Sequence, residues 1–147
     1  MKRVLVTGGA GFIGSHLAET LLREGFDVRV LDDFSSGREE NLSGIVGDVE
    51  LLRGDLRDAG LLARAVEGVD VVFHEAAVPS VPRSVAEPVR THEVNATGTL
   101  SVLQAARDAG VRRLVFAASS SAYGDTPVLP KVESMPATPL SIAKPEE

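Results

Sequence analysis

Three glycines near the start of the chain have the spacing of a phosphate-binding turn. In the stretch VTGGAGFIGSH they are Gly8, Gly11 and Gly14, spaced G-x-x-G-x-x-G directly after an apolar run. Glycine lets a backbone turn tightly and approach a pyrophosphate, because it has no Cβ. The free amides and the dipole of a helix that begins there attract the phosphate charge. The alternative is a tight strand–helix turn that holds no ligand.

A carboxylate about 20 residues beyond this loop supports the nucleotide interpretation. Asp32 ends the run VRVLD, where a carboxylate accepts hydrogen bonds from the adenosine ribose and repels a 2′-phosphate. Asp33 is adjacent and is placed to share this role. Arg38, in the following loop, leaves NADP as a lesser alternative, and Asp32 itself has the alternative of a solvated turn carboxylate. The pattern favours NAD as the cofactor.

A third acidic position is expected at the same edge of the fold. Asp55, in the segment RGDLRD, follows the third predicted strand. There it either contacts the adenine amine, with the Leu56 backbone alongside, or serves as a helix cap or turn residue. Both interpretations remain open.

Short apolar runs alternate with helical patterns along most of the chain. Strands are expected at residues 4–7, 28–32, 49–53, 69–74 and 111–119, and helices at about 12–23, 59–67 and 91–108. Asp58 is expected to cap the second helix. Parallel strands joined by helices make right-handed crossovers. We therefore expect an α/β fold, a Rossmann-like doubly wound parallel sheet with strand order 3-2-1-4-5.

Composition bounds the class of protein. The chain has 147 residues, a net charge of −6 and no cysteine, which excludes disulfides and thiolate metal sites. The acidic balance argues against nucleic acid or a membrane surface as the main partner. No apolar run reaches the roughly 18–20 residues of a membrane span, and no signal peptide is recognisable. We expect a cytoplasmic protein without a metal site, since its three histidines are isolated in the sequence.

The domain organisation follows from a shift in composition. Five of the eight prolines come after Tyr123, and such a segment is loop-like. We expect a nucleotide-binding domain at residues 1–124 and a proline-rich tail at residues 125–147.

The order of the motifs resembles the extended short-chain dehydrogenase/reductase family, and within it the nucleotide-sugar epimerases and dehydratases. The motifs are TGGAGFIGSH, LDDFSSG, GDLRD, FHEAAVPSVPRSV, EVNATGTL and SSSAYG, spread over nearly the whole chain. The segments HEAAVPSVPRSVAEP and SSSAYGDTPVLPKVE are most similar to UDP-hexose 4-epimerases, including those that handle N-acetylated sugars. The resemblance implies NAD as cofactor, a UDP-sugar as substrate and hydride-transfer epimerisation at a sugar hydroxyl.

The resemblance also implies roles for individual residues. The pyrophosphate would contact Gly8, Gly11, Phe12, Ile13 and Gly14, the ribose Asp32, and the adenine Asp55 and Leu56. Ala76 and Ala77 would line the cofactor channel, Ser84 would approach the sugar nucleotide, and Asn95 would be a buried helix residue that steadies the site. Ser119, four residues before Tyr123, matches the catalytic Ser or Thr that hydrogen-bonds the reacting hydroxyl. His74 is expected to be structural.

The proton-transferring pair of the family is missing from its expected place. In the family a tyrosinate takes the proton, and a lysine four residues later lowers the pKa of that tyrosine, which is near 10 when free. Tyr123 is the single tyrosine, and Pro127 stands four residues after it. Leu140 stands four residues before Lys144, and an alignment on PLSIA puts Ile142 and Ala143 where proline and tyrosine belong. We therefore expect the N-terminal portion of such an enzyme, catalytically deficient and truncated or replaced before the Tyr-x-x-x-Lys helix.

Two other functions remain open. The chain is alternatively a short NAD-binding sensor or regulatory module without turnover, or an enzyme of another type that uses Ser119 or Tyr123 as an acid or base. Without the family's later strands and substrate domain, the fifth strand would have an unpaired edge and apolar surface would be exposed. A homo-oligomer is therefore expected.

Overall fold

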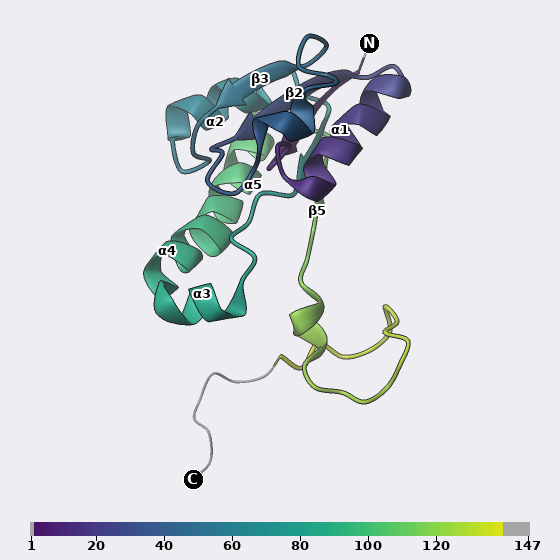
Figure 1. Cartoon of the computed structure of the whole chain (residues 1–147), viewed down its shortest axis with the longest axis vertical. Coiled ribbons are helices and arrows are strands. Elements are labelled where there is room, and N and C mark those ends of the chain that lie inside the picture. The colour runs from purple at the N-terminus through teal and green to yellow at the C-terminus, as the bar shows by residue number, and fades with distance from the viewer. Residues whose placement is uncertain (1, 140–147) are drawn as a thin grey trace. The chain divides into compact units, whose positions relative to one another are not determined.

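The computed structural model describes residues 2–139, and the chain divides into two compact units, Met1–Phe116 and Ala117–Glu147. The first unit is built on a five-stranded sheet with helices packed against it (Figure 1). Its strands are β1 (Arg3–Thr7), β2 (Asp27–Asp32), β3 (Glu50–Arg53), β4 (Val71–His74) and β5 (Arg113–Phe116). They lie in the order β3-β2-β1-β4-β5, and every pairing is parallel. The expected fold and strand order are confirmed.

Five α-helices connect the strands. They are α1 (Phe12–Arg23), α2 (Ala59–Val66), α3 (Val81–Ala86), α4 (Pro88–His92) and α5 (Thr99–Asp108). A π-helical turn, η2 (Glu93–Gly98), joins α4 to α5, and a 3-10 turn, η1 (Glu39–Leu42), follows β2. Asp58 caps α2 as expected, since its side chain accepts a hydrogen bond from the Leu61 amide.

Two corrections concern the segment between β4 and α5. The helix expected at residues 91–108 begins earlier, at Pro88, and passes through the π-helical turn before α5. The short helix α3 was not expected. Its first turn contains Pro82, which is tolerated there because the first helical amides need no partner within the helix.

The sheet has an apolar cluster on each face. Helix α1 packs on one face, and α2 and α5 pack on the other. The first cluster comprises Val4, Val6, Ala10, Ala18, Leu21, Val28, Val30 and Leu42. The second comprises Leu5, Leu31, Leu52, Leu56, Leu62, Ala65, Val66, Val69, Val72, Val102 and Ala106. Because strands β1 and β2 are covered on both faces, the loops that follow them begin from fixed positions.

The second unit is described by itself. Strand β5 ends at Phe116, so residues 117–119, expected to continue that strand, do not. A 3-10 turn, η3 (Ser120–Tyr123), is the regular element among residues 117–139. The prolines after Tyr123 account for this, because each removes a backbone donor.

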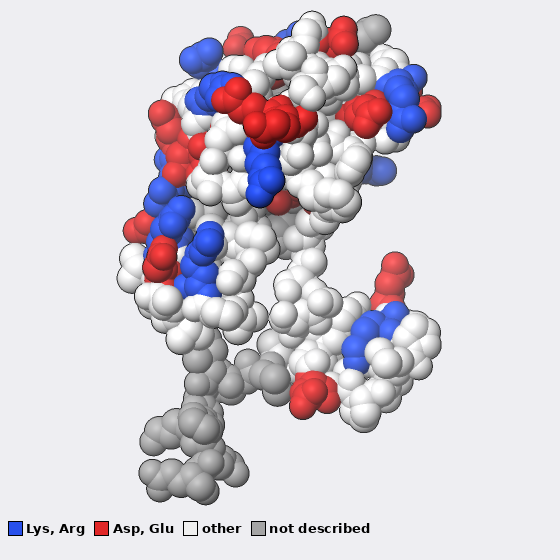
Figure 2. Space-filling model, in the orientation of Figure 1, with Lys and Arg blue, Asp and Glu red and all other residues white. Residues whose placement is uncertain are grey.

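Two observations concern the surface of the described residues. None of their helices has the length and apolar character needed to cross a membrane. On the face shown in Figure 2, acidic and basic side chains are interspersed over the first unit.

Candidate functional site

The glycine loop follows β1 at the carboxyl edge of the sheet. Gly8 has φ +70°, and a Cβ there would lie 2.7 Å from the Ala76 amide nitrogen. A Cβ on Gly14 would collide with the Gly8 carbonyl and lie 2.7 Å from the Gly9 Cα. These close backbone approaches require glycine, so the spacing seen in the sequence reflects the packing of the turn.

The start of α1 presents donors toward the loop. Across residues 2–139, the amides of Phe12, Ile13 and Gly14 donate no hydrogen bond to a protein acceptor. The N-cap is Gly11, which has no side chain to satisfy them. The Phe12 and Ile13 side chains are 78% and 64% exposed. Such a helix terminus, with open amides and a positive dipole end, fits the charge of a pyrophosphate.

Asp32 lies against this loop at the end of β2. Its side chain is buried, with Oδ2 accepting from the Ala10 amide at 2.9 Å and Oδ1 from the Phe34 amide at 2.8 Å. Each oxygen keeps a further lone pair for a ligand hydroxyl. Asp33, in contrast, is exposed and accepts from the Ser35 amide. Asp32 is therefore not a solvated turn carboxylate.

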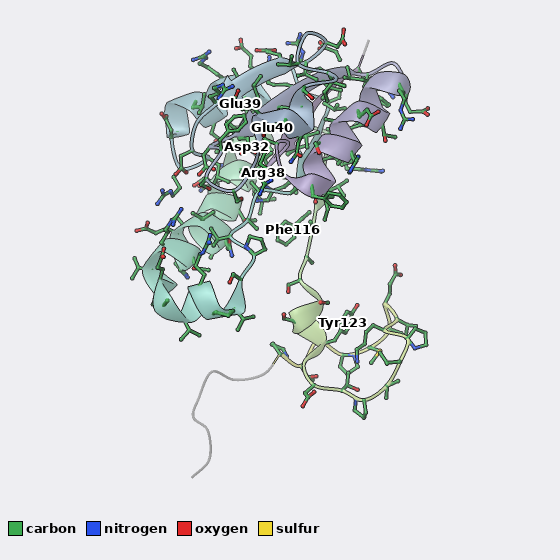
Figure 3. All side chains as sticks on the ribbon, viewed as in Figure 1. Asp32, Arg38, Glu39, Glu40, Phe116 and Tyr123 are labelled. Carbon is green, nitrogen blue, oxygen red and sulfur yellow. The ribbon has the colours of Figure 1, made fainter. Side chains whose placement is uncertain are left out.

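The loop after β2 is tied to the glycine loop at one carbonyl. The oxygen of Ala10 accepts from the Arg38 amide at 3.0 Å and from the Asn41 side chain at 2.8 Å. A Cβ on Gly37 would lie 2.8 Å from Asp32 Oδ1. Arg38 itself is exposed on this loop, next to Asp32 in the view of Figure 3. Neither Asn41 nor Gly37 was predicted from the sequence. Asn41 binds a backbone carbonyl, and Gly37 is needed only because the chain passes close to Asp32, so neither belongs to a recognisable motif.

The third acidic residue, Asp55, is held by an arginine. Arg57 donates to it from its amide at 2.8 Å and from its guanidinium at 2.6 to 3.0 Å. These hydrogen bonds lower the pKa of the Asp55 carboxyl below its ordinary value. Arg57 also donates to Glu93 of the π-helical turn at 2.8 Å. Leu56 is buried in the cluster under α2 and α5. Asp55 is thus a turn residue in an ion pair with Arg57, and no motif had pointed to Glu93 as a further partner of that arginine.

The loop after β4 lies beside the glycine loop. Ala76 is half-buried and Ala77 exposed. Asn95 of the π-helical turn holds the next residue, because its Oδ1 accepts from the Val78 amide at 2.8 Å and its Nδ2 donates to the Val78 carbonyl at 3.2 Å. Asn95 was expected to be buried and is half-buried. π-helical turns are often found at functional sites.

His74 is the one buried histidine among the described residues. Its ring lies between two threonines, with Nδ1 2.6 Å from Thr7 Oγ1 and Nε2 3.0 Å from Thr99 Oγ1. Burial lowers the pKa of this imidazole. The expectation of a structural histidine agrees with these contacts, since both ring nitrogens have partners.

The remaining expected site residues lie within or directly before short helical segments. Ser84 is half-buried in α3, where its hydroxyl donates to the Val81 carbonyl at 2.8 Å. Ser119 is exposed in the second unit, and its Oγ accepts from the Ser121 amide at 3.1 Å. Tyr123 ends the 3-10 turn of the same unit. Leu140, Ile142, Ala143 and Lys144 lie outside the described residues.

A metal site finds no support in the geometry. Within residues 2–139, no group of three or more His, Asp or Glu side chains is placed to hold a metal ion. His16 and His92 are both exposed, on α1 and α4 respectively.

Comparison with known proteins gives the family. The profile of the NAD dependent epimerase/dehydratase family matches residues 4–146. The chain belongs to this family. It is 46% identical over 143 residues to a UDP-glucose 4-epimerase of Mycolicibacterium smegmatis, a match that covers 95% of this chain and 46% of that protein. The resemblance drawn from the motifs is confirmed, and so is NAD as the cofactor of the family.

Solved structures agree on the fold. A UDP-N-acetylglucosamine 4-epimerase from Methanobrevibacter ruminantium M1, in complex with UDP-N-acetylmuramic acid, has a TM-score of 0.87 and 39% identity. That match covers 95% of this chain and 45% of the other. A UDP-glucose 4-epimerase from Bifidobacterium longum, in complex with NAD+ and UDP, has a TM-score of 0.85 and 35% identity, covering 93% and 43%. The chain therefore spans less than half the length of these relatives.

Proposed function

We propose that this chain binds NAD, through a domain at residues 1–124, as the cofactor-binding portion of a UDP-sugar 4-epimerase-like protein. One observation carries the proposal. The open amides of Phe12, Ile13 and Gly14 lie at the carboxyl edge of the sheet, next to the strand whose end places Asp32 against the same loop. Dinucleotides bind at this edge of doubly wound sheets, at the point where the strand order reverses.

Each part of the loop has a separate task in this proposal. Gly8, Gly11 and Gly14 allow the backbone to approach the pyrophosphate, and the amides at the start of α1 donate to its oxygens. Asp32 accepts from the ribose hydroxyls with its remaining lone pairs, and its charge disfavours the 2′-phosphate of NADP. Asp33 is exposed, and we propose only a lesser contribution from it. When bound, NAD supplies a hydride acceptor and donor at its nicotinamide ring.

Residues from other loops complete the proposed contacts. Ala76 and Ala77 would line the channel that leads from the pyrophosphate, and Leu56, with Asp55, would lie near the adenine. The arginine on Asp55 occupies much of its hydrogen-bonding capacity, so we assign the adenine contact to the backbone of this turn first. A UDP-sugar is the proposed substrate because the relatives are UDP-sugar epimerases, with Ser84 and Ser119 toward the sugar.

The 147 residues are proposed to be deficient in catalysis. Ser119 alone lacks an activating base, and the residue four positions after Tyr123 is Pro127. In the family's pattern a lysine at that position favours the tyrosinate that acts as the base, and proline cannot take that role. We also propose that the chain self-associates, since Val115 and Phe116 of the edge strand are exposed.

Calorimetric titration with NAD tests the binding proposal. We expect saturable binding in which ADP competes, and a loss of about tenfold or more in affinity for Asp32→Ala, because hydrogen bonds to a charged group contribute roughly 1.5–3 kcal/mol. Asp33→Ala is the matched control, with an expected loss below about threefold. No heat with NAD and no competition by ADP would mean that the glycine loop is only a turn.

Turnover and assembly need separate measurements. With NAD and UDP-galactose or its N-acetyl analogue, proton NMR should show no epimerised product. Formation of UDP-glucose would overturn the proposed deficiency without affecting the proposal for NAD. Sedimentation velocity should show a species larger than a monomer, and a monomer across micromolar concentrations would contradict self-association.

A further inference from the structure

A continuous series of hydrogen bonds joins the base of the glycine loop to the π-helical turn. Thr7, the last residue of β1, accepts from the Ala76 amide at 3.3 Å, and its Oγ1 lies 2.6 Å from His74 Nδ1. On the other side of the ring, Nε2 lies 3.0 Å from Thr99 Oγ1, which bonds the Asn95 carbonyl at 2.7 Å. These residues are far apart in sequence and come from β1, β4 and the helical segment after it.

The direction of each hydrogen bond follows from the last acceptor. A carbonyl oxygen only accepts, so the Thr99 hydroxyl must donate to Asn95. Having used its one proton, Thr99 can only accept from the ring, which places the His74 proton on Nε2. The bare Nδ1 then accepts from the Thr7 hydroxyl, and Thr7 accepts from Ala76. The network is therefore fully satisfied by one state of His74, the neutral ring with its proton on Nε2.

Protonation of His74 would break this series. A second ring proton on Nδ1 would face the Thr7 hydroxyl proton, which would have to turn away from its present acceptor. The groups facing the ring are uncharged: Thr7 from β1, Thr99 from α5 and Phe116 from β5, whose ring stacks at 5.6 Å. Glu75, the adjacent titratable residue, is part-buried and has a raised pKa. Burial correspondingly lowers the pKa of His74 below its ordinary value.

The series ends on groups that shape the proposed cofactor site. Thr7 immediately precedes Gly8, whose α-carbon packs against the Ala76 backbone. At the other end of the series, the backbone carbonyl of Asn95 accepts from the Thr99 hydroxyl. The side chain of Asn95 in turn hydrogen-bonds both the amide and the carbonyl of Val78. The ring of His74 therefore links the base of the glycine loop to the segment that holds residues 75–78, in addition to the backbone pairing of β1 with β4.

We propose that His74 is a positioning residue for NAD: its neutral Nε2–H ring holds the glycine loop and residues 75–78 at the separation that the dinucleotide requires. The inference rests on the proposed function. It makes the affinity for NAD depend on a group that does not touch the cofactor. The affinity should fall as the pH falls through the pKa of His74 in the folded protein, which burial lowers below the ordinary value of 6.5.

Calorimetry at several pH values tests the positioning role. Thr99→Val preserves side-chain shape and removes the acceptor of the ring proton, so the affinity for NAD at pH 7.5 should fall about threefold to tenfold. Thr99→Ser should restore it. His74→Asn keeps an acceptor for Thr7 but cannot titrate, so its weakened affinity should not change between pH 7.5 and pH 5.5. His92→Gln, on an exposed histidine, is the matched control and should keep the wild-type pH profile.

Nitrogen-15 NMR of the imidazole gives a readout that needs no cofactor. His74 should show a protonated Nε2 and a bare Nδ1 at pH 7.5. The opposite tautomer, or wild-type affinity in Thr99→Val with no pH dependence, would overturn the role of His74 while NAD binding stands. Failure of the wild-type chain to bind NAD at any pH would instead overturn the proposed function, and the positioning role with it.

Discussion

Val6 and Val115 lie in one row of paired residues on the same face of the sheet, but only Val6 is buried. Val6 pairs with Phe73, and Phe73 pairs with Val115. Val6 is fully buried, whereas Val115 is 42% exposed. The same residue type on neighbouring strands thus has a different environment because α1 covers β1, while β5 lies at the end of the row. Coverage by a helix, rather than strand propensity, decides the burial here.

The opposite face shows the same gradient along another row. Thr7 and His74 are almost completely buried, and Phe116, which pairs with His74, is 51% exposed. The well-covered strands β1 and β2 are also those that carry the glycine loop and Asp32. The proposed site is therefore built on the most firmly packed part of the sheet, and β5 contributes little to it.

The largest difference in stability between the covered strands and β5 is expected when an arginine is replaced. The guanidinium of Arg29, on β2, is buried, pairs with Glu50 and donates to three carbonyls at the C-terminal end of α2. Arg29→Met should lower the free energy of unfolding by about 3 kcal/mol, because those carbonyls lose their donor. Arg113→Met, on exposed β5, should change it by less than about 0.5 kcal/mol. Urea denaturation of both variants measures this, and equal losses would contradict the gradient.

The valine row gives the next largest effect. Val6→Ala should cost about 2 kcal/mol, from roughly 0.8 kcal/mol per buried methylene-sized group and the cavity that remains. Val115→Ala should cost under about 0.5 kcal/mol, since its side chain is already partly solvated. Urea denaturation of the Val6→Ala and Val115→Ala variants measures both losses of stability. A large loss at Val115 would show that something covers that face in solution.

Two glycines with similar backbone angles allow the turn after β1 to be compared with the turn before β5. Gly8 follows β1 and has φ +70°, and Gly110 precedes β5 and has φ +73°. Gly110→Ala meets no atom within 4 Å and should cost only the left-handed strain of about 1–2 kcal/mol. Gly8→Ala adds a clash with the Ala76 backbone, so it should also reduce NAD affinity more than tenfold. Calorimetric titration of both variants with NAD separates backbone strain from the geometry of the site. Equal affinities for NAD in the two variants would argue against a role of the Gly8 turn in binding.

The smallest effect is expected at the exposed ion pair of the turn after β3. The Arg57 hydrogen bonds lower the pKa of Asp55 below its ordinary value of 3.8. The stabilisation is therefore present above pH 3.8 and is lost as the pH falls through the lowered pKa. Arg57→Gln should flatten this acid limb of the stability curve while changing stability little at pH 7. A series of urea titrations from pH 5 to pH 2.5 measures the slope, and an unchanged slope would contradict the assignment.

Much of the first unit followed from local patterns. The bounds of α1 were predicted from the apolar spacing and the glycines that flank it, and the strand order from the alternation of strands and helices. The helix α3 was not predicted, although Pro82 is compatible with a first helical turn. The π-helical turn had no signal at all, because the residues 93–98 also fit a regular helix.

The candidate site also contains residues that local spacing predicts and contacts that form only in the folded sheet. The placement of Gly8, Gly14 and Asp32 at one loop was predictable, because it depends on fixed spacing within one strand–helix–strand unit. The partners of His74 were not, since Thr7 and Thr99 stand 67 and 25 positions away and meet only in the folded sheet. Arg57 was visible two residues after Asp55, but its second partner, Glu93, belongs to a different connection.

The parallel arrangement leaves the opposite edge of the sheet available for engineering. The turns that lead into β2, β4 and β5 contain Gly25, Gly68 and Gly110, and each faces open space. Exposed turns of this kind accept inserted segments readily. A fluorescent protein placed in one of them would stand a full strand length from the glycine loop, attached to the same rigid sheet. The chain thus offers three attachment points for a genetically encoded reporter of dinucleotide levels.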